Sequence, residues 1–256
     1  MDSIILKDKE YTIKKYNLIL EKKDINEIGE ILGLDSLTYL LELNLRKNNI
    51  HKIEKLDKLK NLRKLELSRN QISEINNVKS LTNLEVLDLK RNKISEIKGL
   101  ETLTNLRELN LIDNEIEEIK GLENLTNLEV LYLSGNKIRE IKGLNNLKKL
   151  KELFLAENQI DEIKGLENLK NIEILNLSLN EFGEIKGLEN QRKLKEIILG
   201  IKGSSGQYKL NGRKIDRGLV QYLRDPSYLN VVLKARKVVE FCRNPEKYYI
   251  DNRTYI

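Results

Sequence analysis

The sequence predicts an α/β solenoid in which a curved, parallel β-sheet lines the concave face and short 3₁₀ or turn segments line the convex face. The chain repeats itself every 22 residues: LTNLEVLDLKRNKISEIKGLET, from residue 81, is followed directly by LTNLRELNLIDNEIEEIKGLEN. Charged residues make up 34% of the chain, aromatic residues 5%, and there is no Trp. Such a composition suits the thin core of a repeat array better than one compact globule.

Each copy contains the pattern LxxLxLxxNxI, as in Leu106, Leu109, Leu111, Asn114 and Ile116. Alternation at Leu109 and Leu111 predicts a short strand with both leucines on one face, which the next copy covers. Apolar residues then recur every third position, which favours 3₁₀ or extended turns. The asparagines should turn inward and bond backbone groups, forming a structural ladder: Asn48, Asn70, Asn92, Asn114, Asn136, Asn158 and Asn180.

This pattern resembles the leucine-rich repeat family, specifically the 22-residue class found in the protein phosphatase-1 regulatory subunit. The resemblance implies a solenoid and makes a phosphatase or another regulatory enzyme a conceivable partner. Seven residues after each asparagine stands a column that is mostly Gly and predicts positive φ, with Lys55 as the strained exception: Lys55, Asn77, Gly99, Gly121, Gly143, Gly165 and Gly187.

The ends of the chain depart from the repeat. Residues 1–17 are expected to form an N-terminal β-hairpin that caps the open edge of the sheet. Residues 18–199 are expected to hold one degenerate copy, seven full copies and one partial terminal copy. Residues 200–256 are expected to form a helical cap, with a helix that begins at Asp225-Pro226 and continues through Cys242.

The C-terminal segment has two interpretations. Residues 200–256 carry 12 basic and 5 acidic side chains, an excess of +7, and six of the ten tyrosines. The segment either covers the core of the last repeat or offers a surface for anions or proteins. The second interpretation allows binding to nucleic acid or an anionic membrane through Lys234, Arg236, Lys237 and Arg243.

Residues between the buried leucines should point out onto the concave face. The early copies are polar there, whereas the later copies place Tyr132 and Phe154 side by side among apolar residues bordered by carboxylates. Such a patch predicts a protein-binding site, and a fold-back of the C-terminal segment or a self-dimer are the alternatives. The candidate residues are Glu108, Ile112, Val130, Tyr132, Glu152, Phe154, Ile174 and Ile198.

Chemistry-bearing motifs are missing from the sequence. It holds no Walker-type loop and no GxSxG, and one His (His51) with one distant Cys cannot form a zinc site. We therefore expect no catalytic residue, metal, cofactor or small-molecule substrate. The single Cys242, the absence of a signal-like start and the absence of a long apolar run favour a cytoplasmic protein. The predicted function is a monomeric, non-catalytic scaffold that binds another protein. The alternative is an adaptor on nucleic acid or membrane.

Overall fold

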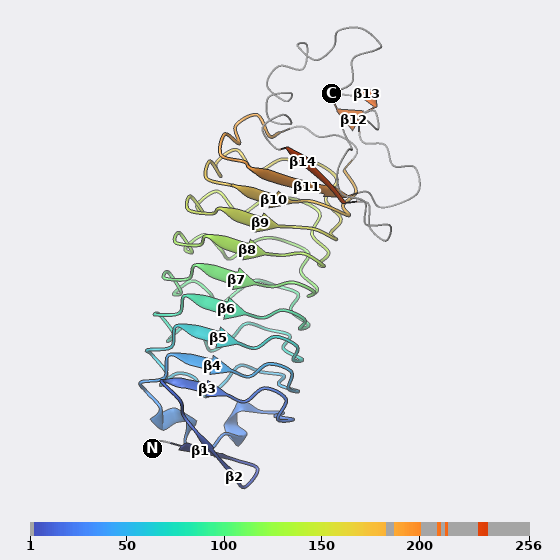
Figure 1. Ribbon diagram of the computed structural model, residues 1–256. Helices are drawn as coiled ribbons and strands as arrows, with labels where there is room; N and C mark the ends of the chain where they lie inside the picture. Colours follow the sequence, from blue (N-terminus) through green and yellow to red (C-terminus); the bar gives the residue numbers. More distant parts are fainter. Residues whose placement is uncertain (1–2, 183–186, 201–208, 211–212, 215–229, 235–256) are drawn as a thin grey trace.

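The computed structural model describes residues 3–182, 187–200, 209–210, 213–214 and 230–234, and it shows the expected solenoid (Figure 1). Its main sheet has the order β14-β11-β10-β9-β8-β7-β6-β5-β4-β3. Each copy adds one parallel strand beside the last, in register. These strands are β3 (Asn17–Ile19), β4 (Glu42–Asn44), β5 (Lys64–Glu66), β6 (Val86–Asp88), β7 (Glu108–Asn110), β8 (Val130–Tyr132), β9 (Glu152–Phe154), β10 (Ile174–Asn176) and β11 (Glu196–Gly200).

The core runs the length of the array as one continuous column of Leu and Ile. Leu109 and Leu111 are fully buried, as the period-two alternation predicts. On the return path, the backbone N–H of Leu128 donates to the carbonyl of Leu125 at 2.9 Å, a three-residue turn that matches the spacing of apolar residues. Two full 3₁₀ helices occur in the degenerate first copy, η1 (Ile28–Glu30) and η2 (Leu34–Ser36).

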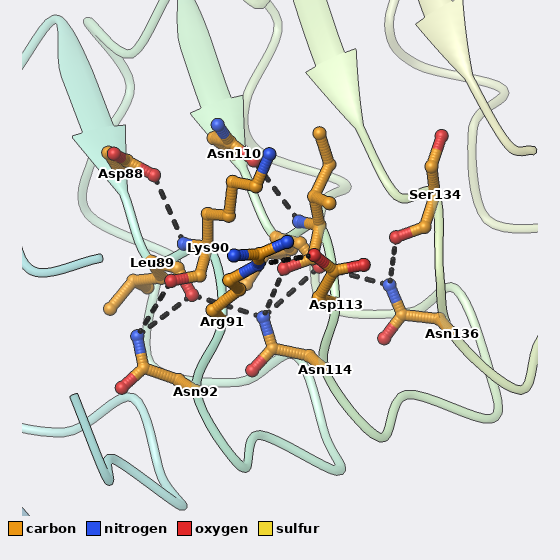
Figure 2. A network of polar contacts seen from close by, with 12 residues as sticks. Asp88, Leu89, Lys90, Arg91, Asn92, Asn110, Asp113, Asn114, Ser134 and Asn136 are labelled. Atoms are coloured by element: carbon orange, nitrogen blue, oxygen red, sulfur yellow. Dashed lines mark hydrogen bonds and ion pairs between the residues drawn. The ribbon is translucent and has the colours of Figure 1, made fainter. Parts of the chain in front are cut away.

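The ladder asparagines join each coil to the one before it (Figure 2). The Asn114 Oδ1 atom accepts from the N–H of Ile94 at 3.0 Å. Its Nδ2 group donates to the carbonyls of Leu89 (3.0 Å) and Leu111 (3.1 Å). The same contacts recur at the other full copies, so one side chain satisfies backbone groups that the turn would leave buried and unpaired.

The glycine column adopts the left-handed conformation that the sequence predicts. Gly165 has φ of 81°, and Lys55 has φ of 57° as the expected exception. A Cβ atom on Gly165 would lie 1.9 Å from the carbonyl oxygen of Ile141 in the preceding coil. At Asn77 the side-chain amide instead donates to the equivalent carbonyl, that of Ile53, at 2.8 Å. The coils therefore stack too closely for most side chains at this point.

The N-terminal hairpin forms as expected from β1 (Ser3–Leu6) and β2 (Lys9–Thr12), but it does not extend the main sheet. Its Ile4 and Leu6 side chains are buried at the end of the repeat core. Backbone bonds join Ile5 to Leu32 in both directions. The hairpin thus caps the apolar end of the core rather than the edge of β3, because covering Leu and Ile removes more apolar surface from water.

The expected C-terminal helix is contradicted at Asn230–Lys234, which form strand β14. This strand pairs antiparallel with β11, with Ile198 opposite Val232. The open edge of β11 offers unpaired backbone donors and acceptors, and the β-branched Val231 and Val232 favour a strand there. A short hairpin, β12 (Lys209–Leu210) with β13 (Arg213–Lys214), precedes it. The rest of the expected helical cap lies outside the described residues.

Candidate protein-binding face

The strand register brings the outward-facing residues into straight columns across the sheet. Glu108, Val130, Glu152 and Ile174 are successive Cα partners, and so are Asn110, Tyr132, Phe154 and Asn176. These residues alternate with fully buried leucines, and each is partly exposed. The repeat pattern therefore predicts correctly which side chains face outward.

An aromatic pair stands at the centre of this face. The rings of Tyr132 and Phe154 stack with centroids 4.8 Å apart and planes 15° from parallel. Ala156, one column further, is 8% exposed, and its N–H donates to Ser134 Oγ at 3.1 Å. The stacked rings hold each other in place, so they offer a rigid apolar surface that loses little entropy when a partner binds.

The structure brings most of the candidate residues together, but Ile198 stands apart. Asn176 separates it from Phe154 within the middle column. The Asn176 side chain is held locally, since its Oδ1 accepts from the N–H of Ser178 at 3.0 Å and from its hydroxyl at 2.8 Å. Within the described part of the chain, β14 extends the sheet beside Ile198 and does not lie over the aromatic pair.

Two carboxylates flank the aromatic pair. Burial raises the pKa of Glu108; Lys64 lowers it, and Asp88 and Glu152 raise it further. The pKa of Tyr132 is also raised, first by burial and then by Glu108 and Glu152. Both acidic side chains therefore act on the space around the tyrosine hydroxyl, and their negative charge is poorly compensated there.

Neutralising Glu108 should stabilise the protein at neutral pH. A carboxylate with a raised pKa in the fold adds stability in its protonated form, and this contribution is lost as pH rises through the folded pKa. Glu108→Gln should therefore raise the melting temperature at pH 7 relative to the parent. The gain should disappear near about pH 4, where the parent glutamate is largely protonated. Thermal unfolding of both proteins at the two pH values checks this; an unchanged melting temperature at pH 7 contradicts it.

The polar half of the face differs in its charge balance. Lys64 pairs with Glu66 at 3.2 Å, and Lys47 pairs with Glu21 at 2.7 Å. At the rim, the Nε atom of Arg91 donates to Asp113 at 2.9 Å (Figure 2). These cations are neutralised within the chain, so the early copies offer less unpaired charge than their composition indicates.

Two further columns of residues were not predicted from the sequence. Charges of alternating sign stand one residue before each strand from β5 to β11, and Glu129 bonds both Arg107 (3.0 Å) and Lys151 (2.5 Å) across neighbouring coils. In the sequence, this column is visible as a charge that changes sign from one copy to the next: Arg63, Glu85, Arg107, Glu129, Lys151, Glu173 and Lys195. A second, exposed asparagine ladder bonds carbonyls of the preceding coil: Asn61, Asn83, Asn105, Asn127 and Asn171.

Metal-ligating clusters and membrane-spanning helices are both missing from the residues that the structure places. There, no three His, Cys, Asp or Glu side chains gather as a metal site would require. No helix in this part of the chain is long and apolar enough to span a bilayer.

Comparisons with known proteins place the repeats in a broad class. The family model described as leucine-rich repeats (2 copies) matches residues 82–124, 104–146 and 126–168, and the model described as leucine-rich repeat matches 58–74. No curated protein matches the chain. The matched residues are leucine-rich repeats, and the chain folds as a leucine-rich repeat solenoid, a fold that is typical of protein-interaction scaffolds.

Two solved structures share this architecture, and both are internalins from Listeria monocytogenes str. 4b F2365. Internalin C2 is 29% identical, with a TM-score of 0.66 over 72% of this chain and 80% of its own. An internalin designated inlF is 30% identical, with a TM-score of 0.62 over 67% of this chain. The present chain covers 50% of that protein's length.

Proposed function

We propose that this chain is a non-catalytic scaffold that captures another protein on the concave face of strands β7–β10. The observation that carries the proposal is the stacked Tyr132–Phe154 pair, which stands partly exposed on a sheet face where packing does not require aromatic residues. Aromatic side chains at the centre of an interface commonly contribute most of its binding energy. The surrounding contacts are expected from Ile112, Val130 and Ile174, with Ile198 at the margin and Glu108 and Glu152 as orienting charges.

The proposal extends to the setting and the form of the interaction. The single Cys242 supports a reducing, cytoplasmic location, and we expect the scaffold to act as a monomer. Regulation of a partner enzyme, such as a phosphatase, is one form that capture could take. Identifying the captured protein from the native cell tests the location and the regulation of a partner enzyme.

Loss of the aromatic pair should abolish capture without unfolding the protein. Both side chains point away from the core, so the double substitution Tyr132→Ser and Phe154→Ser should leave the fold intact. Each truncation of such an anchor typically costs about 2 kcal/mol or more of binding energy. A pull-down with parent and variant, with circular dichroism as the folding check, measures the effect. Undiminished capture by the folded variant contradicts the proposal.

Lys64→Ser with Lys90→Ser is the matched control at the polar end of the same face. This variant should weaken capture only mildly, mostly through the association rate, because such charges steer encounter more than they hold the complex. Salt distinguishes the alternative adaptor function: binding of nucleic acid or anionic membrane through residues 200–256 should weaken steeply with ionic strength, whereas apolar docking should not.

A further inference from the structure

The apolar half of the concave face contains acidic side chains and no basic ones. Across β7–β10, the three outward columns hold twelve residues without a Lys or Arg: Glu108, Asn110, Ile112, Val130, Tyr132, Ser134, Glu152, Phe154, Ala156, Ile174, Asn176 and Ser178. Among the described residues, neither Glu108 nor Glu152 forms an ion pair. The face therefore carries negative charge that the described residues leave unpaired.

The neighbouring column shows that this fold readily neutralises its carboxylates. One residue before the strands, Glu85 contacts Arg63 at 3.1 Å and Glu173 contacts Lys195 at 2.5 Å. Glu129 contacts two cations. All three directly precede a strand, and Glu108 and Glu152 are the first residues of β7 and β9. Partly buried carboxylates without such partners lose hydration without compensation. An external cation would supply the compensation that the described residues do not.

The spacing of the two carboxylates suits one cationic side chain. Glu108 lies on β7 and Glu152 on β9, with Val130 of β8 between them as the Cα partner of both. Strands lie about 4.8 Å apart, so the two backbones are about 9.6 Å apart. A cation above Val130 is then within reach of both carboxylates. The stacked rings beside it offer an apolar surface for a methylene stem.

We propose that the partner inserts an arginine side chain between Glu108 and Glu152, with its stem against Val130 and the Tyr132–Phe154 pair. The inference rests on the proposed function and names the chemistry of that partner: a basic segment with apolar neighbours. Arginine suits the site better than lysine because its planar guanidinium has several fixed donors and can donate to two carboxylates at once.

Selection of short random peptides on the immobilised full chain tests this chemistry without requiring the natural partner. Enriched peptides should carry an arginine beside apolar residues. The affinity of a synthetic enriched peptide should fall at least about tenfold when Glu108→Gln and Glu152→Gln are combined. Exchange of the peptide arginine for citrulline, which is neutral and of the same shape, should cause a similar loss. The control, Glu85→Gln with Glu173→Gln, removes the same charge one residue earlier and should leave affinity within about twofold.

The possible outcomes distinguish a failure of the arginine site from a failure of the proposed binding face. Peptides that lose affinity with Tyr132→Ser and Phe154→Ser, but carry no arginine or ignore the two glutamine substitutions, overturn the inference and leave the binding face in place. Peptides that bind equally to the serine variant, or a selection that enriches none, overturn both. Equal losses from the control pair and the Glu108–Glu152 pair indicate general electrostatic attraction and also overturn the arginine site.

Discussion

Gly165→Ala should lower the free energy of unfolding by about 2 kcal/mol or more. The residue has φ of 81°, where an L side chain costs about 1–2 kcal/mol. The new Cβ would also meet the carbonyl oxygen of Ile141 at 1.9 Å. That oxygen belongs to the backbone of the preceding coil, so relief requires the two coils to move apart and to loosen their packing.

Urea unfolding of the parent and the variant measures this effect, and Lys55→Ala is its matched control. Lys55 occupies the same column and already has a side chain at φ of 57°, so its truncation should change stability by less than about 0.5 kcal/mol. Equal losses at the two positions would contradict the view that close stacking of coils, rather than side-chain identity, selects glycine.

Asn114→Ala should lower the free energy of unfolding by about 1–3 kcal/mol, the cost of leaving buried backbone groups unpaired. The amide bonds Ile94 and Leu89 in the preceding coil and Leu111 in its own. Alanine removes all of these contacts where water has little access, since Asn114 is 8% exposed.

Asn105→Ala is the control that compares an exposed asparagine hydrogen bond with the buried one of Asn114. Asn105 donates to the carbonyl of Thr82 at 2.9 Å, also across one coil, but at an exposed position where water can replace it. Its loss should cost less than about 0.5 kcal/mol. A melting temperature of Asn114→Ala as high as that of Asn105→Ala would contradict a structural role for the inner ladder.

Much of the fold follows from the sequence because the period itself sets the register. Once Leu109 and Leu111 are assigned to the core, the outward columns and the glycine column are fixed for every copy. A second left-handed column, directly before the ladder asparagines, could not be predicted, because it accommodates Lys47, Arg91 and Leu179 as well as glycine. At these positions the hydrogen bonds of the ladder asparagines hold the backbone in the left-handed conformation against the preference of the residue. The residue type therefore does not predict the conformation.

The ends and the site were harder to predict for different reasons. Helical spacing of apolar residues near Val231 competes with the unpaired edge of β11, and that edge exists only in the assembled sheet. On the concave face, the sequence predicts that Tyr132 and Phe154 are neighbours, but not that their rings stack. It also cannot show that the Asn176 side chain is held by Ser178, since the repeat sets the direction of outward side chains but not their contacts.

Site-specific photo-crosslinking tests the binding face most directly. A benzophenone side chain at Asn110, the Cα partner of Tyr132 on β7, should form a covalent adduct with the captured protein. The same group at Lys120, on the return path, should form none. Adducts from position 120 with none from position 110 would contradict capture on the concave face and move the interface to the other side of the solenoid.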